Sequence, residues 1–181
     1  MLKVYLKVFV LMGAIFFFTF LAGNMISMVE AVTALQTAAL MAVLGGTLLS
    51  AIMGTVHIRT ARKVAGGPRE TDIYSLTQVR QVKAKLPYDR AFAMVEHYFK
   101  EVAGYKLTNT DHVAGTLEAS PAAGFLPSPT VILASIQKEG EDASAITLTV
   151  KPLLPGVAVD FGRNLLAAEK ADAYLRASLH A

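Results

Sequence analysis

The chain has 181 residues, with 17 lysines and arginines against 14 aspartates and glutamates, and it contains neither cysteine nor tryptophan. The absence of cysteine excludes disulfides, thiolate metal sites and covalent c-type haem. The small basic excess includes no long lysine- or arginine-rich block, so we expect no nucleic-acid partner. Only Lys3, Lys7 and Glu30 are charged before His57, so an apolar third precedes a remainder of ordinary globular composition.

Residues 4–21 form a first apolar run that only Lys7 interrupts. At about 1.5 Å per residue the run spans about 27 Å, close to the thickness of about 30 Å of a bilayer's hydrocarbon core. We expect a first transmembrane helix at about residues 4–22, with Lys3 and Lys7 reaching the headgroups at one end. A secretory signal peptide opens in the same way, but this apolar core is longer than usual, so we expect it to be retained.

A second apolar run, residues 31–56, predicts a second transmembrane helix at about residues 28–58. Ser27 and Glu30 have the spacing of a capping box at its start. The short connection predicts an antiparallel hairpin. The second run also carries a stripe of small residues four apart, which permits close helix contact in a bilayer; its members are Ala34, Ala38, Ala42, Gly46, Ser50 and Gly54.

This small-residue stripe has two possible uses. It packs the hairpin on itself, or it also receives another copy of the chain or a different subunit. Six small positions exceed what one partner helix needs, which favours an additional partner. We therefore expect a homo-oligomer or a larger membrane complex, together with contact to membrane lipids.

Basic residues predict how the hairpin is oriented. Lys3 and Lys7 precede the first run and Arg59, Arg62 and Lys63 follow the second, whereas the connection carries only Glu30. The positive-inside bias then places both termini in the cytoplasm, in a bacterial inner membrane. The three basic residues after the second run fall on one side of a continuing helix. They contact anionic headgroups there or serve only to fix topology.

A linker at residues 65–72, containing Gly66, Gly67 and Pro68, separates the predicted hairpin (residues 1–64) from a soluble domain at residues 73–181. The domain is long enough for one modest core. A strand at 76–86 is followed by a helix that starts at Pro87 and ends before Gly104. Four further strands are expected at 105–109, 113–119, 131–136 and 146–150, with a turn at 110–112, a Pro/Gly-rich loop at 121–129 and an acidic turn at 139–142.

The last helix follows the sequence Asp-Phe-Gly-Arg-Asn at residues 160–164, in which Asp160 or Asn164 is expected to cap the helix and Gly162 to permit a turn. The order β-α-β-β-β-β-α predicts a small antiparallel sheet with two helices on one face, an α+β domain. This motif and order resemble small α+β domains appended to membrane segments in uncharacterised bacterial proteins, a resemblance that implies no activity. Helix-grip folds share parts of the order, which implies by analogy a ligand groove between sheet and helix.

No residue pattern predicts chemistry. The triplet at residues 160–162 matches the kinase metal-binding triplet, but the chain has no glycine-rich phosphate loop and no His-Arg-Asp sequence. The four histidines lack the spacing of a helical zinc site. Asp111 and His112 have no identifiable nucleophile, and the acidic residues at 139–142 lack the periodicity of a calcium loop. We expect no enzyme, metal site or cofactor.

These observations lead to one expected function and two alternatives. The leading one is a non-enzymatic membrane protein, an accessory or scaffold subunit that assembles through the small-residue stripe and presents a cytoplasmic α+β domain. The first alternative is a homo-oligomeric pore or channel. The second is a membrane-anchored sensor with an apolar cavity lined by Phe92, Phe99 and Leu148.

Overall fold

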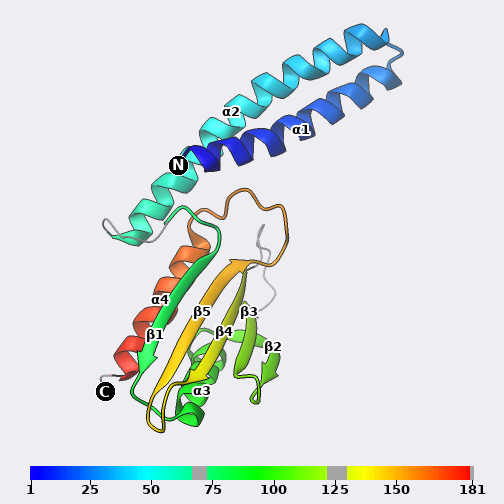
Figure 1. Ribbon diagram of the computed structural model, residues 1–181. Helices are drawn as coiled ribbons and strands as arrows, with labels where there is room; N and C mark the ends of the chain where they lie inside the picture. The colour runs from blue at the N-terminus through cyan, green and yellow to red at the C-terminus, as the bar shows by residue number, and fades with distance from the viewer. Residues whose placement is uncertain (67–72, 122–129, 180–181) are drawn as a thin grey trace.

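The computed structural model describes residues 1–66, 73–121 and 130–179, and it consists of a long helical hairpin and an α+β domain (Figure 1). The hairpin is formed by α1 (Leu2–Ile26) and α2 (Ala31–Ala65). Both helices are long and apolar enough to cross a membrane, judged by length and composition. With 35 residues, α2 is about 52 Å long, so it extends past the start of α1 and reaches the domain (Figure 1).

The predicted capping box at the start of α2 is wrong. The N-cap of α2 is Glu30, which makes no side-chain cap hydrogen bond. Ser27 instead ends α1, where its backbone N–H donates to the carbonyl oxygen of Gly23. Met28 then turns the chain with a positive φ of 55°. Since Ser27 still belongs to the end of the first helix, its hydroxyl is not available to cap the second.

The domain is built on one antiparallel five-stranded sheet with the strand order β1-β5-β4-β3-β2. Its strands are β1 (Gln78–Ala84), β2 (Tyr105–Asp111), β3 (Thr116–Pro121), β4 (Thr130–Lys138) and β5 (Ser144–Pro152). Helix α3 (Tyr88–His97) continues into a π-helical turn, η1 (Tyr98–Val102), and α4 (Arg163–Leu179) follows β5. The predicted order β-α-β-β-β-β-α and the α+β class are confirmed.

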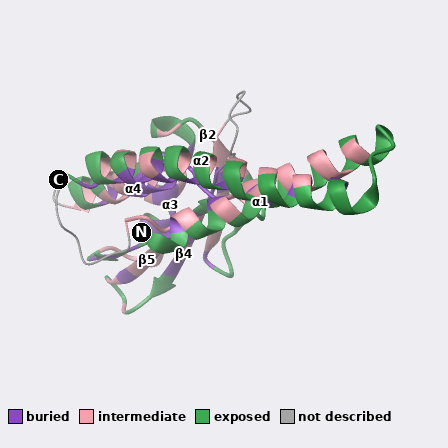
Figure 2. Ribbon diagram, turned by 90° about the horizontal axis from the view of Figure 1, so that it is seen from above, coloured by how far each residue is buried: buried purple, intermediate pink, exposed green. Residues whose placement is uncertain are grey.

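One face of the sheet packs against α3, η1 and α4 to form the core of the domain. Side chains from both helices meet those of the central strands there, among them Phe92, Phe99, Leu117, Ile132, Ile146, Leu148 and Leu175. Figure 2 shows these buried segments grouped in the domain, whereas exposed residues dominate the hairpin. The opposite face of the sheet carries no helix among the described residues and is only partly buried.

The first strand is tied to α4 by polar contacts. Arg80 is only 9% exposed, and its Nη2 lies 2.6 Å from Oε1 of Glu169 on α4. Its neighbour on the same strand face, Gln78, is also buried, whereas Val79 is 46% exposed. The inward face of β1 is therefore polar in its first half and apolar only at Val82 and Ala84.

The turn between β2 and β3 lies later than predicted. The strand β2 continues to Asp111, and the turn occupies residues 112–115 instead of 110–112. The carboxylate of Asp111 accepts hydrogen bonds from the N–H groups of Val113 and Ala114, at 3.0 and 2.9 Å. Gly115, with φ +68°, then directs the chain into β3. An Asx-type turn of this kind places the aspartate before the turn and not inside it.

Candidate functional site

The small-residue stripe of α2 faces α1. Ala34, Ala38, Gly46, Ser50 and Gly54 are buried, and Ala42 is half-buried. A methyl group at Gly46 would lie 3.2 Å from Cα of Gly13, so the two backbones are in direct contact at this point. Close backbone approach of this kind increases van der Waals contact between helices, which is the main source of helix association in lipid.

Tyr5 of α1 contacts the later part of the stripe, around Ser50 and Gly54. The hydroxyl of Ser50 donates to the carbonyl oxygen of Tyr5 at 2.6 Å, and the Tyr5 hydroxyl lies 3.1 Å from that of Thr55. Gly54 provides the space for the aromatic ring, because a methyl group there would lie 2.5 Å from it. The stripe thus packs the hairpin on itself, the first of its two predicted uses, while its use by an additional partner remains a prediction.

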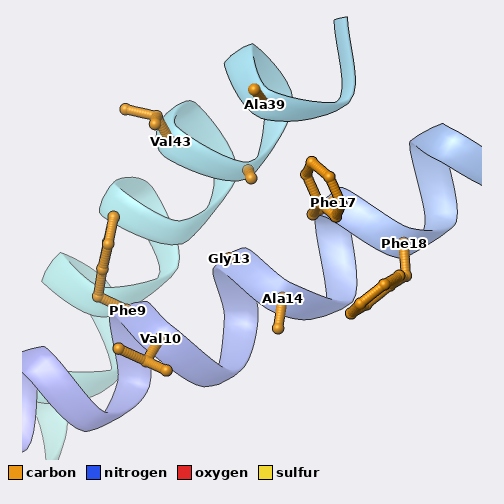
Figure 3. Close-up of a pocket in the computed structure, with 9 residues that line it drawn as sticks. Phe9, Val10, Gly13, Ala14, Phe17, Phe18, Ala39 and Val43 are labelled. Atoms are coloured by element: carbon orange, nitrogen blue, oxygen red, sulfur yellow. The ribbon is translucent and has the colours of Figure 1, made fainter. Parts of the chain in front are cut away.

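A shallow apolar groove of about 410 Å³ runs beside this contact, between the two helices (Figure 3). It is lined by Phe9, Val10, Gly13, Ala14, Phe17, Phe18, Ala39, Ala42 and Val43. Ala14 and Ala39 are exposed, and Ala42 joins the groove to the small-residue stripe. The lining contains no polar side chain, so the groove suits a lipid chain or another apolar helix.

The basic residues gather at the end of the hairpin that meets the domain. Lys3, Lys7, Arg59, Arg62 and Lys63 are all exposed. The Nε of Arg62 donates to the hydroxyl of Tyr74 at 2.9 Å. The predicted continuation of α2 through these residues is confirmed, since the helix extends to Ala65 and ends at Gly66 in the left-handed conformation. The remainder of the predicted linker, residues 67–72, lies outside the described residues.

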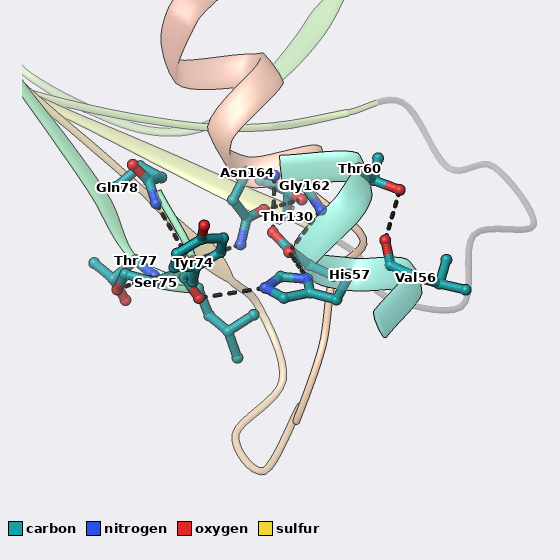
Figure 4. Close-up of polar contacts among 12 residues, drawn as sticks. Val56, His57, Thr60, Tyr74, Ser75, Thr77, Gln78, Thr130, Gly162 and Asn164 are labelled. Atoms are coloured by element: carbon teal, nitrogen blue, oxygen red, sulfur yellow. Dashed lines mark hydrogen bonds and ion pairs between the residues drawn. The ribbon is translucent and has the colours of Figure 1, made fainter. Parts of the chain in front are cut away.

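A buried polar junction connects α2 to the domain (Figure 4). His57 is 1% exposed, Asp160 3% and Asn164 1%. The Nε2 of His57 lies 3.3 Å from the carbonyl oxygen of Tyr74, and Nδ1 lies 3.4 Å from Oδ1 of Asp160. The atoms of the second pair are close but are not aligned for a hydrogen bond, since Nδ1 has no hydrogen-bond partner among the described residues. Two acceptor oxygens of the domain therefore face the imidazole of α2.

Asp160 also organises the turn that receives α2. Its carboxylate accepts hydrogen bonds from the N–H groups of Gly162 and Asn164, at 3.0 and 2.9 Å, so the predicted cap of the last helix is confirmed at Asp160. Phe161 and Gly162 both have positive φ, at 55° and 74°. A methyl group at Gly162 would lie 3.3 Å from the Cα of Ala61, which shows that the backbone of the turn packs directly on α2.

Asn164 extends the junction into the sheet. Its side-chain oxygen accepts a hydrogen bond from the hydroxyl of Thr130 at 2.7 Å, and its amide donates to the carbonyl oxygen of Leu76 at 2.7 Å. Both contacts are short and buried or partly buried, so each satisfies a group that would otherwise lose its hydrogen bond on leaving water. The sequence 160–164 thus links α2, α4, β4 and the segment before β1.

Apolar contacts surround this polar centre. Ala61 and Ala65 of α2 pack on Leu165 of α4. On the other side, Ala158 and Val159, which precede the turn, form a second cluster with Val4 and Val8 of α1. Both helices of the hairpin therefore contact the domain. Sequence reasoning identified Asp160 and Asn164 as capping candidates but missed His57, whose only signal was its place at the end of the apolar run.

The other candidate residues are exposed or take part in local structure. His97 is exposed on α3, and Asp111 is engaged in its turn. Burial raises the pKa of Tyr98 to about 12, which makes the phenol a weaker acid and gives it no evident role in proton transfer at neutral pH. No group of three or more metal-ligating side chains occurs within the described part of the chain.

The residues predicted to line a sensor cavity are packed in the core of the domain. Phe92 is 1% exposed and Phe99 and Leu148 are 0% exposed, so these side chains leave no room for a water-sized molecule. A separate hollow of about 310 Å³ lies on the helix-free face of the sheet, where Leu133, Thr147 and Thr149 are among its lining residues. This hollow is open, and its lining is of mixed polarity.

No protein-family model and no curated protein matches the chain. Among solved structures, one match is the di-domain ARO/CYC BexL from the BE-7585A biosynthetic pathway, with 10% identity and a TM-score of 0.39 over 57% of this chain and 44% of that one. A Thermobifida fusca protein solved by NMR matches with 11% identity and a TM-score of 0.36, over 55% and 86% of the two chains. A Thermus thermophilus protein has 15% identity and a TM-score of 0.29, over 55% and 92%. Similarity this low carries no functional argument, and the chain spans less than half of BexL.

We expect Gly46→Leu to separate the two helices of the hairpin. The new side chain meets the backbone of Gly13, which cannot rotate away, so the free energy of unfolding should fall by about 2–3 kcal/mol. Thermal unfolding in mild detergent should show a midpoint lower by about 5 °C. Gly23→Leu is the matched control, because nothing lies within 4 Å of its Cβ position. Equal midpoints for the two variants would contradict the packing described here.

We expect Gly162→Ala to loosen the attachment of the domain to α2. Gly162 and Gly104 both have positive φ, so alanine at either position costs about 1–2 kcal/mol in backbone strain. Only at Gly162 does the added methyl meet α2, because nothing lies within 4 Å of the Cβ position of Gly104. Hydrogen exchange should therefore become faster at residues 57–65 in Gly162→Ala and stay unchanged in Gly104→Ala. Unchanged exchange in both variants would show that the contact is dispensable.

Proposed function

We propose that the protein is a non-enzymatic, two-pass membrane protein that acts as an accessory or scaffold subunit. In this proposal the hairpin crosses the bilayer, assembles with a second copy of the chain, and holds the α+β domain against the cytoplasmic face of a bacterial inner membrane. The observation that carries it is the buried junction of His57, Asp160 and Asn164, because a docked domain keeps a fixed orientation relative to the helices that anchor it.

The outward surface of the hairpin supports the membrane assignment. Large apolar side chains are exposed along both helices, including Val10 at 60%, Phe18 at 67%, Leu44 at 56% and Leu48 at 61%. A water-soluble monomer rarely exposes a continuous apolar surface of this extent. The same surface is favourable in contact with lipid tails.

The distribution of charge supports the orientation. The five basic residues of the hairpin lie at the end that carries the domain, and Glu30 is the only charged residue in the connection between α1 and α2. A bias of this kind retains the basic end in the cytoplasm. The domain and both ends of the hairpin then share one compartment.

The groove beside the small-residue stripe supports self-assembly. Exposed Ala14 and Ala39 lie beside Ala42 there, among larger exposed side chains such as Phe18 and Val43. Another apolar helix can approach the alanines by placing its own side chains between these larger ones. The helix-free face of the sheet remains open for contact with a cytoplasmic protein. No specific observation favours the pore, and the filled core removes the predicted lining of the sensor cavity.

Single-cysteine labelling tests the topology, because the natural chain has no cysteine. Met28→Cys lies in the connection of the hairpin and is 94% exposed before substitution, and Glu141→Cys lies in the exposed turn between β4 and β5. A membrane-impermeant maleimide added to intact bacteria should label Met28→Cys and should label Glu141→Cys only after the membrane is opened. The reverse pattern, or labelling of both in intact cells, would exclude the proposed orientation.

The mass of the purified protein in mild detergent tests the assembly. We expect a protein mass that is a multiple of the 19.3 kDa chain by light scattering. Ala39→Trp fills the groove and should reduce the mass to that of a single chain, since the bulky ring prevents close helix approach. Ala22→Trp, also exposed on the hairpin but outside the groove lining, is the control. A natural chain that is monomeric throughout would contradict self-assembly.

A further inference from the structure

The connection between β5 and α4 begins with an apolar stretch. Residues 152–159 read Pro-Leu-Leu-Pro-Gly-Val-Ala-Val and contain no polar side chain between the exposed Lys151 and the buried Asp160. Loops at a protein surface are normally polar, because their backbone and side chains face water. An apolar loop of this length therefore indicates a partner that is itself apolar.

The two ends of this loop have different surroundings. Ala158 and Val159 are 9% and 7% exposed and pack against Val4 and Val8 at the start of α1. Leu153 and Leu154, in contrast, are 51% and 55% exposed. The loop is thus anchored on the hairpin at one end and presents two large apolar side chains at the other.

The contact with α1 fixes the level of the loop relative to a bilayer. In the proposed membrane protein the first crossing begins near Val4, and Val8 lies about 6 Å deeper along the helix. Lys3 and Lys7 are exposed at the same level, where their ammonium groups reach lipid phosphates. Figure 1 shows the loop at the end of the sheet that faces the hairpin, beside the start of α1. It therefore lies at the boundary between headgroups and acyl chains.

We propose that this loop inserts Leu153 and Leu154 into the cytoplasmic leaflet and forms a third membrane contact beside the two helices. The inference rests on the proposed two-pass topology. We assign phospholipid as the occupant of the exposed leucines, because the other end of the loop packs against the start of the lipid-facing hairpin. Lys151 flanks the loop and can reach the phosphates while the leucines enter the acyl boundary. The insertion holds the domain against the membrane in addition to the contact of α2 with α4.

Tryptophan fluorescence tests this contact directly, because the natural chain has no tryptophan. The full chain carrying Leu154→Trp is reconstituted into phosphatidylcholine vesicles with and without brominated acyl chains, which quench tryptophan on contact. We expect Leu154→Trp to lose most of its emission in brominated vesicles. Leu153→Trp is a second probe of the same loop and guards against a local effect of one substitution.

Two further single-tryptophan variants separate this inference from the proposed topology. Leu44→Trp, on the exposed face of α2, reports the membrane crossing itself, and Glu141→Trp, at the opposite end of β5, reports a site remote from lipid. Quenching of Leu44→Trp and of the loop variants, with Glu141→Trp unchanged, supports the inference. Quenching of Leu44→Trp alone overturns the loop insertion and leaves the topology intact. Unquenched Leu44→Trp overturns both, and quenching at Glu141 shows contact that is not specific to the loop and overturns the insertion.

Discussion

The packing of α2 on the turn at residues 160–162 is the contact on which the arrangement of the two parts depends. The turn has two successive residues with positive φ, and glycine at position 162 allows its backbone to approach Ala61 directly. A larger side chain on either side of this contact would move the domain away from the helix. Because Asp160 holds the turn through two backbone N–H groups, the surface that receives α2 is formed by the same residues that begin α4.

The polar groups inside this contact determine how the domain is oriented on α2. Apolar surfaces such as those of Ala61, Ala65 and Leu165 pack in many relative positions at similar cost. The contact of the buried His57 Nε2 with the carbonyl oxygen of Tyr74, and the amide of Asn164 that bonds Thr130 and Leu76, form together in only one arrangement. The cost of leaving such groups unpaired then disfavours the alternatives, which is how a buried polar network selects one docking geometry.

Sequence periodicity predicts most of the domain, and its failures have physical causes. Ile146, Leu148 and Val150 alternate with polar residues, which predicts β5; the first half of β1 is irregular because its inward residues are Gln78 and Arg80. The charge of the buried Arg80 is paired with Glu169 of α4, a partner that no local pattern reveals. The late turn after β2 and the missing capping box have the same origin, since each depends on which neighbouring backbone group a side chain meets.

The candidate site was also predictable only in part from the sequence. The four-residue spacing predicts that one face of α2 contacts a helix, because small side chains allow two helix backbones to approach closely in lipid. It does not identify the helix, since Gly13 and Tyr5, which complete the contact, belong to an apolar run without a comparable pattern. His57 and Asp160 are far apart in the sequence, and their proximity depends on the position of the whole domain under the hairpin.

The use of the stripe within the hairpin also constrains any assembly. Gly46, Ser50 and Gly54 are already covered by α1, so a second chain meets only the margin of the stripe at Ala42 and the alanines beside it. Helix contacts in lipid gain little from apolarity alone, because lipid tails match leucine and phenylalanine in this respect. The proposed assembly therefore has to depend on shape within the groove and on contacts between the α+β domains. A domain docked on its own hairpin serves that purpose better than a tethered one, because its contacts with a second chain and those of the helices then form in the same orientation.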